Sequence, residues 1–97
     1  SHIKLNKPCF VSATSANELS NIEMTEIGKE FLFPLITKDS VDLLIIGTGA
    51  SPKFLSPKQQ IELSSIGLGV ECMNNTSACS SFNLLLGDLR KVGLLLI

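Results

Sequence analysis

Two short polar segments hold the residues of this chain that could bind or react. Gly47, Thr48 and Gly49 follow a run of branched apolar residues, and residues 74–80 follow a second strand-like segment. The backbone N–H groups of a glycine-rich turn or of a helix start can bind a phosphate or another small anion. The candidate ligand-binding residues are therefore Gly47, Thr48, Gly49, Asn74, Thr76, Ser77, Cys79 and Asn83.

Simpler roles account for most of these residues. The glycine turn does not match GxGxxG, because Pro52 stands where the third glycine would be, and no lysine follows at Walker spacing, so a structural turn is favoured. Asn75, Thr76 and Ser77 are expected to cap a helix. Asn83 lies among apolar helix residues and, if buried, is expected to hydrogen-bond a neighbouring loop.

The sequence does not offer a complete set of catalytic groups. Cys79 falls in the first turn of an expected helix, but a nucleophile needs a base, and the only histidine is His2 near the N-terminus. A buried, unreactive thiol is the favoured interpretation of Cys79 and of Cys72. No carboxylate pair, metal-ligand cluster or Ser-His-Asp set emerges, so no catalytic residue, metal or cofactor is predicted.

The composition argues against several classes of protein. Eight basic and nine acidic residues are scattered along the chain and give a net charge of −1, which argues against nucleic-acid binding. Three cysteines without a CxxC spacing favour reduced thiols and a cytoplasmic location. No apolar run is long enough to span a bilayer, and the polar residues after Lys4 and Lys7 are not typical of a signal peptide. All five aromatic residues are phenylalanines, most of which are expected in the core.

Residues 41–97 predict a βαβαβ unit that would position both polar segments. Ser56 and Pro57 are a strong helix start, and Gly67 suits the position after the helix end. The expected elements are a strand at 41–46, a helix at 58–66, a strand at 68–73, a helix at 77–86 and a strand at 90–97. The loops after the first two strands would then open at the same edge of a parallel pair, forming a crevice where α/β sheets bind ligands.

Residues 1–40 show a less regular secondary-structure pattern than residues 41–97. Two β-prone segments, 7–13 and 28–36, predict a two-stranded ribbon, with Pro8 and Pro34 at strand edges or ends. The polar segment 15–24 could instead hold one helical turn. At 97 residues the chain is expected to form one domain, with the ribbon region at 1–40 and the βαβαβ core at 41–97.

Three blocks of the sequence resemble a known family. Residues 42–49 (DLLIIGTG), 66–73 (IGLGVECM) and 76–85 (TSACSSFNLL) are similar to the small domain-of-unknown-function family that includes the mitochondrial complex I assembly factor 3 and stand-alone bacterial and archaeal proteins. The resemblance implies a three-layer α/β domain with a mixed central sheet and an added N-terminal β-layer. No enzymatic activity is established for that family, and its mitochondrial member acts in assembling the respiratory NADH dehydrogenase.

This sequence departs from the family pattern in two places. The family usually has an arginine after the cysteine, where Ser80 stands here, and this loss removes the strongest anion-binding group from the crevice. The N-terminal region also lacks the family's glycine- and tyrosine-rich opening, so the resemblance transfers poorly to residues 1–40.

Two functions remain open from the sequence. The first is a non-catalytic protein–protein interaction or assembly module of bacterial, cytoplasmic type, whose apolar patch is covered by an unidentified partner or by a second copy. Peripheral association with a membrane complex during its assembly would need no transmembrane segment. The second is a binder of a small anionic ligand, or a cryptic enzyme, at the strand-end crevice. A ligand site predicts converging unpaired N–H groups there, whereas an interaction module predicts a crevice filled by its own side chains.

Overall fold

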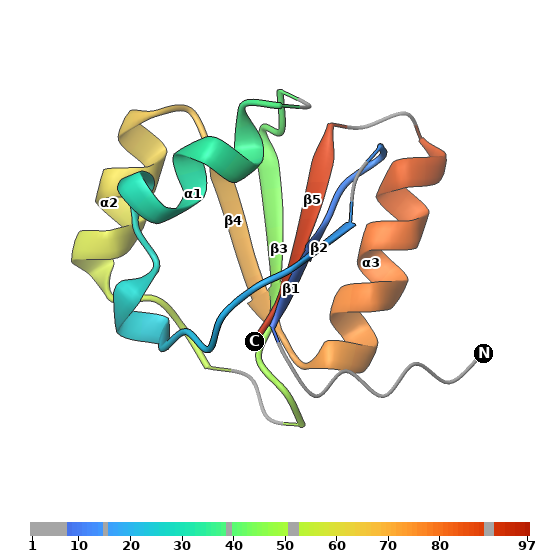
Figure 1. The fold of residues 1–97 in the computed structure, drawn as a ribbon, viewed down its shortest axis with the longest axis horizontal. Coiled ribbons are helices and arrows are strands. Elements are labelled where there is room, and N and C mark those ends of the chain that lie inside the picture. Colours follow the sequence, from blue (N-terminus) through green and yellow to red (C-terminus); the bar gives the residue numbers. More distant parts are fainter. Residues whose placement is uncertain (1–7, 15, 39, 51–52, 89–90) are drawn as a thin grey trace.

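The computed structural model places five strands in one sheet with helices on both of its faces (Figure 1). It describes residues 8–14, 16–38, 40–50, 53–88 and 91–97. The elements are β1 (Cys9–Val11), β2 (Ala16–Glu18), the short 3-10 helix η1 (Met24–Glu26), α1 (Lys29–Ile36), β3 (Leu43–Gly47), α2 (Pro57–Ser65), β4 (Gly69–Met73), α3 (Asn75–Gly87) and β5 (Val92–Leu96).

The sheet is mixed, with the strand order β2-β1-β5-β3-β4. β3 pairs in parallel with both β4 and β5, and β1 pairs antiparallel with β5 and β2. The predicted α/β class, the mixed sheet and the βαβαβ core are therefore confirmed.

The connections place the helices in two layers. The chain leaves β3 through α2 to reach β4 on one side, then returns through α3 to β5 on the other side of β3. Because such crossovers are right-handed, crossovers in opposite directions cover opposite faces of the sheet. Figure 1 shows the result, with α1 and α2 on one face and α3 on the other.

Alternate residues of the buried strands supply a core on each face. Leu44 and Ile46 pack in the cluster that includes Leu32 of α1 and Leu63 of α2. Ile45 points the other way and packs in the cluster formed with α3. The continuous apolar run of β3 is thus explained by burial on both faces.

The predicted helix boundaries are largely confirmed. Ser56 caps α2 by accepting from the backbone N–H of Gln59, whose own side chain accepts from the Ser56 N–H, so the two form a capping box. Gly67 has a φ of 78°, the left-handed conformation expected after a helix end. α3 begins at Asn75, two residues before the predicted start, because Asn74 is the residue that caps it.

One predicted strand is wrong. Residues 28–36 contain α1 rather than the second strand of a ribbon, and Pro34 lies on its exposed side. Leu32 and Ile36, four residues apart, are both buried, whereas Phe33 is 57% exposed. That spacing fits the helical period of 3.6 and not the two-residue alternation of a strand.

The ribbon itself exists, but its second strand is β2, in the polar segment. β2 is exposed at all three residues and forms through pairing with β1, not through an apolar pattern. Because β1 also pairs with β5, the ribbon extends the central sheet. The helices α1 and α2 form the layer over the face of the sheet opposite α3 (Figure 1). The expected separate N-terminal β-layer is therefore wrong.

Candidate functional site

The crevice at the ends of β3 and β4 is closed by hydrogen bonds between its own two loops. The Gly49 N–H donates to the Asn75 side-chain oxygen at 2.8 Å, and the Asn75 N–H donates to the Gly49 carbonyl at 2.8 Å. The Thr48 N–H donates to the carbonyl of Met73, the last residue of β4, at 3.0 Å. The loops are therefore tied to each other rather than open around a ligand.

Side chains also fill the space beneath these loops. A Cβ on Gly47 would lie 2.5 Å from Leu96 Cδ2, 2.6 Å from Asn75 Oδ1 and 3.1 Å from Ala78 Cβ. Such distances are well below van der Waals contact, so Gly47 is needed for close packing of β3 against α3. This explains the glycine without a phosphate.

The predicted site residues do not all come together. Gly47, Thr48, Gly49 and Asn74 come together at the crevice, where the Asn74 side chain accepts from the Ser77 N–H at 2.8 Å. Thr76 and Ser77 are exposed in the first turn of α3, and Cys79 is half-buried against the sheet. Asn83 is exposed further along α3, about 12 Å from the helix start at 1.5 Å per residue, so it needs no buried partner.

Asn75 is the crevice residue that the sequence analysis assigned differently. It was expected to cap α3, but its side chain reaches across to the Gly49 N–H. Two adjacent asparagines after a strand could each cap the helix, and only the position of the neighbouring loop decides which one does. The N–H groups of Gly49 and Ser77, which an anion at the crevice could use, are both taken by asparagine oxygens.

The three cysteines are free and half-buried. Burial raises the pKa of the Cys72 thiol, with a backbone hydrogen bond at Leu55 opposing the shift. Burial also raises the pKa of Cys9, and the nearby Cys79 adds to the effect. Because the thiolate is the reactive form, raised pKa values make Cys9 and Cys72 poor nucleophiles at neutral pH.

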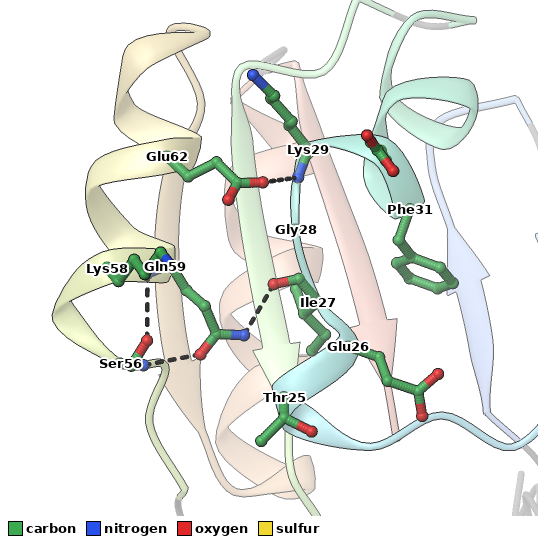
Figure 2. A pocket seen from close by; sticks show the side chains of 11 residues that line it. Thr25, Glu26, Ile27, Gly28, Lys29, Phe31, Ser56, Lys58, Gln59 and Glu62 are labelled. Atoms are coloured by element: carbon green, nitrogen blue, oxygen red, sulfur yellow. Dashed lines mark hydrogen bonds between the residues drawn. The ribbon is translucent and has the colours of Figure 1, made fainter.

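A polar groove of about 580 Å³ lies between α2 and the segment that leads into α1 (Figure 2). The Gln59 amide donates to the Met24 carbonyl at 2.7 Å and to the Ile27 carbonyl at 2.8 Å. The Glu62 carboxylate accepts from the Lys29 N–H at 2.8 Å and so caps α1 from a neighbouring helix. The polar side chains of this groove hold α1 against α2.

We expect Gln59→Ala to lower the free energy of unfolding by about 2 kcal/mol, because it leaves the Met24 and Ile27 carbonyls without their amide donor and weakens the α2 cap. For a domain of this size that corresponds to a fall of about 10 °C in Tm. Lys58→Ala, at the exposed neighbouring position of α2, is the matched control and should change Tm little. Equal Tm values for the two variants would contradict the role given to Gln59.

A second, more apolar groove of about 430 Å³ follows the outer side of α2 and the edge strand β4. It is lined by Pro57, Gln60, Ile61, Ser64, Leu68, Gly69 and Val70. Ile61 is 72% exposed, although isoleucine is among the residue types most often buried. Phe33, Phe54 and Leu84 are also exposed. The other three phenylalanines are buried or pack against the core, as expected for most of the five.

Among the described residues, no group of three or more His, Cys, Asp or Glu side chains could hold a metal ion. No helix within the same ranges has the length and apolar character needed to cross a membrane.

Sequence comparisons relate the chain to bacterial proteins. A family model described as a protein of unknown function (DUF498/DUF598) matches residues 1–97. The 13 kDa major membrane protein of Francisella tularensis is 30% identical over 94 residues, which cover 95% of this chain and 76% of that protein. An uncharacterised protein of Rhodobacter capsulatus is 40% identical over 57 residues, which cover 59% of this chain and 46% of the relative. The matched segment thus spans less than half of the Rhodobacter protein.

The fold is also found in solved structures. The solution structure of a Xanthomonas campestris protein superposes with a TM-score of 0.83 at 20% identity, covering 96% of this chain and 70% of that chain. At this identity the likeness shows the fold alone. The family model spans the whole sequence and confirms the resemblance carried by the three sequence blocks. This chain belongs to the DUF498/DUF598 family of proteins of unknown function.

Proposed function

We propose that this chain is a non-catalytic protein–protein interaction module of the kind used in assembling larger complexes. The observation that carries the proposal is the contrast between its two candidate surfaces. The N–H groups of Gly49 and Ser77 at the strand-end crevice are bonded within the chain, whereas Ile61 presents a large apolar side chain to solvent. A partner surface would bury that side chain.

We also propose where in the cell this module acts. One relative is named the 13 kDa major membrane protein of Francisella tularensis. A chain of this family could reach a membrane by binding a protein there, so we infer peripheral association with a membrane complex, with a cytoplasmic pool of unbound chain. Extraction of the membrane fraction with alkaline carbonate should release the chain, and retention after extraction would contradict peripheral attachment.

A binder of small anions is the second candidate. The exposed Thr76 and Ser77 hydroxyls in the first turn of α3 favour it, since a helix start attracts negative charge. The missing arginine at Ser80 and the bonds already made by the local N–H groups weigh against it.

Two measurements separate these functions. Affinity capture of the tagged chain from its native host should return the same protein repeatedly, in amounts well above those from an untagged strain. Thermal-shift assays with inorganic phosphate and ATP should give no stabilisation, because only a ligand that binds the folded state raises Tm. A rise in Tm that Thr76→Ala abolishes, together with no reproducible partner, would overturn the interaction module in favour of the anion binder.

A further inference from the structure

The edge of the sheet at β4 carries backbone groups that pair with no strand in the described part of the chain. β4 is the last strand of the order β2-β1-β5-β3-β4 and pairs only with β3 among the described strands. The Gly69 N–H bonds to the Asp42 carbonyl on the β3 side, and the Met73 carbonyl accepts from Thr48 on that same side. Because the N–H and C=O groups of a strand alternate in direction, those of Val70 and Cys72 face outward.

A strip of apolar surface runs beside this open edge. The groove between α2 and β4 brings Ile61 of the helix beside Leu68 and Val70 of the strand segment. Ile61 is 72% exposed, whereas Val70 is half-buried and packs against the core cluster on the α2 face. A side chain entering the groove would therefore contact apolar atoms from both the helix and the strand.

The charge on the opposite face of β4 constrains the occupant. Glu71 is exposed and lies between the two outward-facing residues, with its side chain on the other face of the sheet. An antiparallel pair of β4 edges with its two-fold axis at Glu71 would set this carboxylate directly opposite its copy, and like charges so placed are destabilising. A lysine or arginine opposite Glu71 would be favourable instead.

We propose that the β4 edge and the adjoining face of α2 bind an extended segment of another protein, which adds a further strand to the sheet. This inference rests on the proposed interaction function and names its surface. The outward groups of Val70 and Cys72 would bond the partner backbone, and the groove would take an apolar side chain beside Val70. The partner segment would alternate apolar residues with a basic residue opposite Glu71.

The experiment uses a random peptide library displayed on phage and selected against the whole chain. We expect the selected peptides to alternate apolar residues with lysine or arginine. In NMR titrations with such a peptide, the Val70 amide proton, which we expect to exchange quickly in the free chain, should become protected. Ile61→Lys should weaken peptide binding about tenfold or more, as expected for losing a central apolar contact.

Matched variants make the result specific. Leu84→Lys introduces the same charge at a helix residue that is 71% exposed on α3, and should leave peptide affinity within about twofold. Val70→Pro removes an outward N–H that the β3 ladder does not use, and should also weaken binding. Should it fail to fold, Glu71→Lys serves instead, and is expected to shift selection from basic to acidic peptides.

Three outcomes would overturn the proposal that the β4 edge and α2 bind an extended segment. One is a library that yields no enriched peptide, and another is a set of peptides that bind all the variants equally well. The third is a chain that sediments as a dimer and becomes a monomer on Ile61→Lys, since the occupant would then be a second copy. Capture of one and the same host protein by wild type and Ile61→Lys would leave the interaction module standing while removing β4 as its surface.

Discussion

Gly47→Ala is expected to lower the free energy of unfolding by about 3 kcal/mol, at the upper end for an overpacked core. The added methyl would lie 2.5 Å from Leu96 and 2.6 Å from the Asn75 oxygen. Asn75 would have to move, and the Gly49 N–H would lose its partner. The overlap and the lost hydrogen bond act together, because both loops of the crevice meet at this point. Urea unfolding followed by circular dichroism would measure the change.

Gly87→Ala is the matched control for this substitution. Among the described residues, and apart from its chain neighbours and the backbone of its own helix, no atom lies within 4 Å of a Cβ built at Gly87, and the residue ends α3. Alanine there should leave stability unchanged or raise it by up to about 1 kcal/mol, the difference in helix propensity. Equal stability of Gly47→Ala and Gly87→Ala would show that the crevice is not closed and filled by side chains.

Phe10→Ala is expected to be at least as damaging, with a loss of about 3–5 kcal/mol. Phe10 is 1% exposed, and its ring lies over Gly93 of β5, where an added Cβ would approach it to 2.9 Å. It is the residue of β1 that packs in the α1–α2 core, and neither strand of the ribbon has another large buried side chain. Removing the ring should therefore also release β1 and β2 from the sheet.

Phe54→Ala provides the comparison, because it removes the same atoms at a residue that is 71% exposed. It should change stability by about 0.5 kcal/mol or less. Urea unfolding measures both variants, and the amide spectrum of Phe10→Ala should lose the dispersed signals of Cys9–Val11 and Ala16–Glu18. A stable Phe10→Ala chain that keeps those signals would show that the ribbon is held by other contacts.

Much of the fold can be predicted from the sequence where strong local signals agree. Ser56 followed by Pro57 defines the start of α2, and Gly67 defines its end. The apolar run that became β3 is short, rich in branched residues and followed by a glycine turn, which favours a strand covered on both faces over a helix. These signals are local, which is why the βαβαβ core is predicted almost to its boundaries.

The N-terminal region could not be predicted in the same way. A short apolar run such as Phe31-Leu32-Phe33 fits a strand or a helix equally well. The segment is a helix in the folded chain, where Leu32 and Ile36 are both buried. β2 has no apolar alternation and exists only because β1 offers it an edge. Partners distant in sequence decide both elements, and a single sequence does not show them.

The sequence predicts where the two loops of the crevice meet, but not that their own groups close it. The sequence brings Gly47–Gly49 and Asn74 to one edge of the sheet, as the topology requires. It does not show that the Asn75 side chain turns away from its own helix to bond Gly49. Nor does it show that Ile61, on the helix beside the edge strand, is left in solvent.

Photo-crosslinking in living cells of the native host would show whether a partner protein binds at α2 and β4. A benzophenone amino acid would replace Ile61 in one strain and Leu84 in another, two helix positions of nearly equal exposure, 72% and 71%. Irradiation of the Ile61 strain is expected to give one discrete adduct with a host protein, absent from the Leu84 strain. No adduct at either position, or the same adducts at both, would contradict an interaction module that binds through α2 and β4.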